Sequence, residues 1–351
     1  MARFMKNVRF ALASLTLLAL GISLMPAPAL GQQRRLAPGV VTTIPSTPTD
    51  EEMFSGPRPL VEVPIAIPGL EYKPNLSPKS DTIFERAKIG ILRRTIWNLE
   101  FSFKPFRMVE VEIPQANGRI QRKLIWYMVY KVKNNGAHWK PLEKVETFRE
   151  GLVHTTYTKE LTNTITVLGR TTDELRFFPH FVLDAVEFNK TYLDRVLPAA
   201  IPVIRAREFP GDNRTPLYDS QSITEVPIGV STPESDKSVW GVVTWEDVDP
   251  RTDYFSVYIQ GLTNAYRYED PPGAFKAGDA PGSARQLTLK TLRLNFWRPG
   301  DAIAEHEGEV RYGMRIDADA SEQAKIFSLF KANERVDAEW IYRPILGHKE
   351  P

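Results

Sequence analysis

Three aspartates, Asp247, Asp249 and Asp253, lie close together around one polar turn. Their spacing, D-x-D-x-x-x-D, offers several carboxylate oxygens on a turning loop, and such oxygens are the ligands that calcium prefers. The pattern departs from an EF-hand, because Arg251 occupies a ligand position and the closing glutamate is missing. Aspartate is also a common turn-forming residue. The sequence therefore leaves two interpretations, a calcium site and an ordinary polar turn.

Aromatic residues beside this turn offer a second chemistry. Tyr254 and Tyr258 share one face of a predicted strand, and Trp240 lies on the strand before the turn. Flat aromatic rings on an exposed sheet can stack against sugar rings, whereas in a covered sheet they pair across strands or enter the core. These three residues form the candidate ligand-binding set.

Several other chemistries find no pattern in the sequence. The chain has no cysteine, which excludes disulfides, thiolate nucleophiles and a lipid-modified cysteine. A G-x-S-x-G nucleophile elbow and the glycine-rich phosphate-binding patterns are missing too. The formal net charge of +2 gives no electrostatic case for binding nucleic acid.

The elements that must position the candidate residues are β-strands. The stretch Val239–Leu262 predicts a hairpin of two apolar and aromatic runs around a short polar turn. In its second strand Phe255, Val257 and Ile259 alternate with more polar residues and are expected to face the core. Its first strand is apolar on both faces, so we expect it inside the sheet rather than at the edge. The run Leu124–Tyr130 predicts another central strand for the same reason.

The N-terminal part divides into two segments before the folded region. Residues 1–31 combine basic residues, an uncharged apolar run and small residues, which is typical of a secretory signal peptide. An uncleaved anchor is the alternative, because the apolar run is just short of a membrane span. Residues 32–80 carry nine prolines and are predicted to form a proline-rich disordered tether. Residues 81–344 are predicted to form a β-sandwich, as one domain or as two subdomains meeting near residue 229.

The fold class follows from many short, aromatic-rich strands separated by proline, glycine and asparagine turns. They predict a mainly β protein, an immunoglobulin-like or Greek-key β-sandwich. Two short helices are expected as well. The N-terminal helix is predicted over Asp81–Arg94, where Thr82 and Glu85 form a capping box, and the C-terminal helix begins at Ser321.

Three runs of this sequence are distinctive: RKLIWYMVYKVKN (Arg122–Asn134), WGVVTWEDVDPRTDYFSVYIQGLTNAYR (Trp240–Arg267) and LRLNFWRPGD (Leu292–Asp301). They resemble a family of uncharacterised secreted proteins of planctomycete bacteria, over roughly Asp81 to Arg343. The resemblance implies export and a shared β-rich fold. It implies no activity and no site residues, because none is assigned to that family.

These features predict an exported, secreted or periplasmic protein that is not an enzyme and that binds or organises components of the cell envelope. Its partner is an unidentified envelope protein or glycan, and no transmembrane segment is expected once the signal is cleaved. No cofactor is expected beyond the calcium considered for the turn. The alternative is a polysaccharide-binding or polysaccharide-degrading protein that uses the Trp240–Leu262 hairpin, with Glu246, Asp247 or Asp249 as acids.

Overall fold

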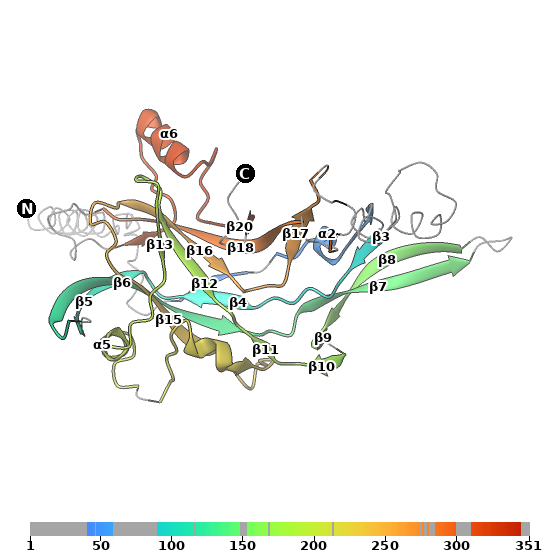
Figure 1. Ribbon diagram of the computed structural model, residues 1–351, viewed down its shortest axis with the longest axis horizontal. Helices are drawn as coiled ribbons and strands as arrows, with labels where there is room; N and C mark the ends of the chain where they lie inside the picture. The colour runs from blue at the N-terminus through green and yellow to red at the C-terminus, as the bar shows by residue number, and fades with distance from the viewer. Residues whose placement is uncertain are drawn as a thin grey trace, which may run out of the picture. The chain divides into compact units, whose positions relative to one another are not determined.

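The computed structural model describes residues 41–45, 47–58, 90–114, 117–147, 153–167, 169–212, 214–271, 273, 276, 279–280, 285–299 and 310–344. All of them belong to the compact unit Gly39–Pro351, which is mainly β (Figure 1). The signal peptide predicted for residues 1–31 lies outside the described residues, as does most of the tether predicted for residues 32–80.

The first of two large sheets, called sheet 1, is antiparallel and is built on one long strand, β6. Its strands are β1 (Thr42–Ile44), β4 (Glu100–Phe103), β5 (Arg107–Pro114), β6 (Ile120–Lys133) and β15 (Val239–Trp245). β4 and β5 pair with successive parts of β6, and β15 pairs with the stretch of β6 from Trp126 to Val132. The central position predicted for Leu124–Tyr130 is therefore confirmed.

The second large sheet, called sheet 2, is also antiparallel and is built on the long strand β18. Its strands are β12 (His180–Ala185), β13 (Lys190–Leu193), β16 (Tyr254–Gln260), β17 (Tyr266–Glu269), β18 (Gln286–Trp297), β19 (Arg311–Tyr312) and β20 (Ala338–Pro344). β16 and β17 pair in series along one side of β18. β20 and β19 pair with residues of β18 that also pair with β16 or β17. They therefore lie along the other side of β18.

The remaining described strands form two-stranded pairs. They are β2 (Phe54–Arg58) with β3 (Gly90–Arg93), β7 (His138–Thr147) with β8 (Val153–Thr162), β9 (Ile165–Val167) with β10 (Arg170–Thr172), and β11 (Leu175–Arg176) with β14 (Pro227–Ile228).

The helices are α2 (Asp50–Met53), α5 (Ala200–Glu208), the 3-10 turn η3 (Ser222–Glu225) and α6 (Ala320–Leu329). α6 begins one residue before Ser321, where the sequence predicts the C-terminal helix. Among the described helices, none has the length and apolarity needed to cross a membrane.

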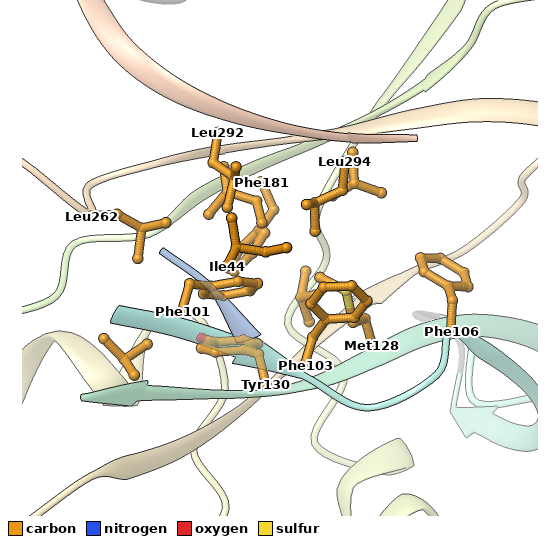
Figure 2. Close-up of a cluster of buried hydrophobic side chains, with 14 of the residues drawn as sticks. Ile44, Phe101, Phe103, Phe106, Met128, Tyr130, Phe181, Leu262, Leu292 and Leu294 are labelled. Atoms are coloured by element: carbon orange, nitrogen blue, oxygen red, sulfur yellow. The ribbon is translucent and has the colours of Figure 1, made fainter. Parts of the chain in front are cut away.

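Sheets 1 and 2 share one hydrophobic cluster, which we call the shared cluster (Figure 2). Sheet 1 contributes Phe101, Phe103, Met128 and Tyr130, and sheet 2 contributes Phe181, Leu292 and Leu294. Phe255, Val257 and Ile259 of β16 also enter the cluster, so the face predicted for them is confirmed. Burying each such side chain stabilises the fold by roughly 1.5–3 kcal/mol, which makes this cluster the main source of cohesion between the sheets.

The predicted hairpin over Val239–Leu262 is wrong, although both of its strands exist. β15 pairs with β6 in sheet 1, whereas β16 pairs with β12 and β18 in sheet 2. Residues 246–253, which we call the crossing segment, therefore carry the chain from one sheet to the other. Period-two alternation determines which side chains face the core, but it does not determine which strand lies alongside. Here the two strands face the shared cluster from opposite sides.

β15 also lies at the end of its sheet and not inside it, contrary to the prediction. On the side away from β6, Tyr218 makes two backbone hydrogen bonds with it, to Trp240 O (3.1 Å) and from Val242 N (2.8 Å). Its second apolar face is covered by α5, because Val242 packs in a cluster with Ala200 and Ile204. Coverage by a helix, and not a central position, is the reason why both faces of this strand are apolar.

Two N-terminal predictions also need correction where the structure describes the chain. A helix is predicted over Asp81–Arg94, but the last part of this range forms the strand β3. Residues 81–89 lie outside the described residues. Part of the predicted tether is folded: β1 pairs with β4, Ile44 enters the shared cluster, and α2 buries Met53. Pro57 lies at a register shift between β2 and β3, where a strand tolerates the missing N–H.

Candidate functional site at the crossing between the sheets

The crossing segment is a tight turn built by its own aspartates. Asp247 adopts a left-handed backbone (φ 58°), a conformation that aspartate tolerates better than most residues. The Asp249 carboxylate accepts the Arg251 backbone N–H (3.1 Å), and the Asp249 carbonyl accepts the Thr252 N–H (3.0 Å). The Asp249 N–H donates to the Tyr192 hydroxyl (3.1 Å), which fixes the turn to β13. The turn-forming role expected of aspartate is therefore present.

The first half of the crossing segment is ion-paired with sheet 1 and with the chain after β13. Lys123 Nζ lies 2.9 and 3.0 Å from the two carboxylate oxygens of Asp247 and 3.5 Å from Glu246. Arg195 binds the other oxygen of Glu246 at 3.0 Å. The hydrogen bond from Lys123 to Asp247 is the main reason why the pKa of Lys123 is raised.

The second half is paired with different cations. Asp249 accepts two hydrogen bonds from the Arg251 guanidinium (3.0 and 2.8 Å) and one from Lys190 (3.1 Å). These bonds, that from Arg251 first, hold the pKa of Asp249 well below its usual range. Asp253 lies 3.5 Å from Arg298.

The candidate metal ligands thus have separate cationic partners, and their carboxylate oxygens do not converge on a common point. Within the ranges that the structure describes, no group of three or more histidine, aspartate or glutamate side chains is arranged to hold a metal ion. A calcium ion at Asp247, Asp249 and Asp253 would have to displace at least Lys123, Lys190 and Arg251 from these carboxylates. Calcium binding here stays a prediction.

The ion pairs of Asp249 predict how the stability of the fold changes at acidic pH. Because its folded pKa lies below the unfolded value of about 3.9, ionised Asp249 stabilises the fold above that pH. This stabilisation is lost as the pH falls through the lower, folded pKa. Asp249→Asn should therefore lower Tm by a constant amount from pH 7 to about pH 5, and the difference from wild type should shrink below about pH 4. Thermal unfolding of both proteins checks this, and a difference that stays constant down to pH 2 would contradict it.

The three candidate aromatic residues do not form one surface, which corrects the expectation that Trp240 lies beside the tyrosines. Trp240 points away from the shared cluster on sheet 1, where its ring packs edge-on against Phe209 at a centroid distance of 5.2 Å. Tyr254 and Tyr258 point away from the same cluster on sheet 2. The shared cluster therefore separates Trp240 from the two tyrosines.

Both tyrosine rings already pack against neighbouring side chains. The Arg343 guanidinium lies 3.7 Å from the centre of the Tyr258 ring, and Tyr254 packs edge-on against Phe330 at 6.1 Å. The Tyr254 hydroxyl accepts a hydrogen bond from Arg315 (3.3 Å). A sugar that stacked on Tyr258 would have to displace the arginine from that face of the ring.

Arginine stacked on tyrosine recurs around sheet 2, and sequence reasoning missed it. The strand alternation places the tyrosines, but their arginines come from other strands and loops, so no local spacing reveals the pairs. Further pairs are Arg94 on Tyr266 (3.7 Å), Arg285 on Tyr268 (3.8 Å) and Arg267 on Tyr342 (4.0 Å).

Sequence reasoning also missed a buried cluster of charged side chains between α5 and sheet 1, because its members are far apart in the chain. Glu208 accepts hydrogen bonds from Arg107 (2.7 Å) and from the Tyr127 hydroxyl (2.8 Å), and Lys104 Nζ lies 3.7 Å from its carboxylate. Burial is the main cause of the raised pKa of Tyr127 and of the lowered pKa of Lys104. Each group has a partner, so the arrangement fastens α5 to sheet 1.

Comparisons of this chain with protein-family models, with curated proteins and with solved structures found no match.

Proposed function

We propose that this protein is exported and is not an enzyme, and that it binds or organises components of the cell envelope outside the cytoplasm. The export part rests on the signal-peptide pattern of residues 1–31. We propose further that the two sheets belong to an immunoglobulin-like, Greek-key sandwich. Two antiparallel sheets around one shared cluster support this.

The pairing of the acids at the crossing segment carries the non-enzymatic part of the proposal. A glycoside hydrolase needs one carboxyl group whose pKa is raised, so that it can donate a proton to the leaving oxygen. Glu246, Asp247 and Asp249 are instead bound to lysine or arginine, and the pKa of Asp249 is lowered. The lowered pKa keeps Asp249 ionised, and the cationic partners of all three acids suit a structural turn better than proton donation to a leaving oxygen.

The test is a hydrolysis assay on a panel of polysaccharides with the purified protein and its Asp247→Asn and Asp249→Asn variants. We expect no turnover by any of the three proteins. Turnover by the wild type that either substitution abolishes would overturn the proposal and would establish the polysaccharide-degrading alternative.

A second measurement identifies the partner. The tagged protein is used to capture material from native envelope extract, and the bound fraction is analysed for both protein and glycan. A discrete protein partner is expected if the protein organises the envelope. Enrichment of glycan that is lost in Tyr258→Ala or Trp240→Ala would move the assignment to a polysaccharide-binding protein.

A further inference from the structure

The β7–β8 pair differs from the two large sheets because it is a long ribbon of only two strands. The strands pair over their full length, from His138 with Thr162 to Thr147 with Val153 (Figure 1). Among the described strands, neither β7 nor β8 belongs to a larger sheet. A ribbon of two strands is only marginally stable in water, and a third or fourth strand that adds a covered face stabilises it. The ribbon is therefore a candidate for pairing with a further strand.

The two outer edges of the ribbon are not equivalent. On the β7 edge, Trp139 already exchanges two backbone hydrogen bonds with Ile96 (both 2.8 Å), and Pro141 lacks an N–H. The β8 sequence, VHTTYTKELT, contains neither proline nor glycine. Among the described residues, no backbone hydrogen bond outside the ribbon reaches β8. An added strand would therefore pair with β8.

The faces of the ribbon favour a partner that covers apolar side chains. Val145 and Leu161 lie on the same face by their register, and each is 57% exposed. Trp139 lies on this face too, with Lys159 Nζ 5.1 Å from its ring. A sheet that continues past β8 places the side chains of the added strands beside Leu161.

The charges of the ribbon permit pairing with a second copy of the same chain and give no attraction for a polyanion. Its three lysines and three glutamates cancel: Lys140, Lys144 and Lys159 against Glu143, Glu146 and Glu160. A neutral surface with both signs interspersed does not attract a polyanion and does not repel its own copy. A second copy also presents the same β8 edge, and two β8 strands related by a two-fold axis run antiparallel.

We propose that two copies of this protein associate through β8, which pairs antiparallel with β8 of the partner copy and joins the two ribbons into one four-stranded sheet. The order of strands is β7-β8-β8-β7. This gives each ribbon the additional strands that stabilise it.

Spin labels on cross-strand neighbours test the order of strands. The chain has no cysteine, so Thr158→Cys on β8 and Leu142→Cys on β7 each carry one label at directly paired positions. In the proposed dimer the labels at 158 lie one strand spacing apart laterally, and those at 142 lie about 10 Å farther apart in that direction. The distance between copies, measured by electron paramagnetic resonance, should be shorter at 158 for every register along the strands. A shorter distance at 142, or no distance between copies, would overturn the proposal.

Charge substitutions at the same positions give an independent test that keeps the ribbon. Thr156→Lys combined with Thr158→Lys places like charges in the middle of β8, where they repel the same charges of the partner strand when the two strands pair over their length. The dimer dissociation constant, measured by analytical ultracentrifugation, should rise at least tenfold. Leu142→Lys on the β7 edge is the matched control and should leave the constant within twofold of wild type. A monomeric wild type across the micromolar range, or equal effects of the two changes, would contradict the proposed pairing.

Discussion

Replacing Glu52 with glutamine is expected to lower the free energy of unfolding by about 3–5 kcal/mol. Glu52 lies on α2 and binds Lys290 of β18, with Nζ 2.7 Å from Oε1 and both side chains 3% exposed or less. The Tyr342 hydroxyl donates to the same carboxylate oxygen, and Lys290 also donates to Thr47 O (2.6 Å). Without the carboxylate, the buried ammonium of Lys290 loses its counter-charge while it remains cut off from water.

The measurement is urea unfolding of Glu52→Gln beside a matched control on the same helix. Asp50 forms an ion pair with Lys159 at 2.8 Å, but both side chains are about half exposed. Asp50→Asn should therefore cost about 1 kcal/mol or less. Adding Lys290→Met to Glu52→Gln removes the orphaned charge and should recover part of the loss. Equal effects of Glu52→Gln and Asp50→Asn would show that the segment 47–53 is not held by this buried pair.

Gly261→Ala is expected to cost about 3 kcal/mol or more in stability, through two effects that act together. Gly261 follows β16 with a φ of +94°, a backbone conformation that alanine adopts only with strain. An added Cβ would also lie 2.2 Å from the Phe178 carbonyl oxygen. This oxygen belongs to the main chain just before β12, so it cannot rotate away as a flexible side chain would.

Gly118 is the control that separates the two effects. It lies in the turn between β5 and β6 with a φ of +76°, and a Cβ there would meet no atom of the described residues within 4 Å. Gly118→Ala should therefore cost only the backbone strain, about 1–2 kcal/mol. Urea unfolding should show Gly261→Ala to be the more destabilising by about 1–3 kcal/mol, the usual cost of overpacking. Equal losses would mean that the chain around Phe178 yields to the added methyl group.

Local patterns predicted single strands well. The alternation of Phe255, Val257 and Ile259 identified the core face of β16, and the run Leu124–Tyr130 identified the centre of sheet 1. Both signals depend only on neighbouring residues in one strand, where side chains alternate between two faces. The mainly β character follows from the same information.

The candidate site was predicted only as separate pieces. The sequence placed Asp247, Asp249 and Asp253 on one turn, and the structure has that turn. Arg251 is a near neighbour of Asp249, but Lys123, Lys190 and Arg298 come from distant parts of the chain, so no local spacing could reveal most of the pairing that makes these carboxylates structural. Trp240 was grouped with the tyrosines because a hairpin was assumed, and that grouping failed with the hairpin.

The sequence by itself determined that β6, β15 and β16 are strands, which of their faces are apolar, and that the turn between β15 and β16 is acidic. Only the tertiary structure decided that these two strands belong to different sheets and that residues 42–53 join the folded unit. Strand and turn signals depend on side-chain type and local geometry, which a short window of sequence contains. The choice of a partner depends on which surfaces meet once the chain has folded. Glu52 and Lys290 illustrate this, because they form a buried ion pair although they are far apart in the sequence.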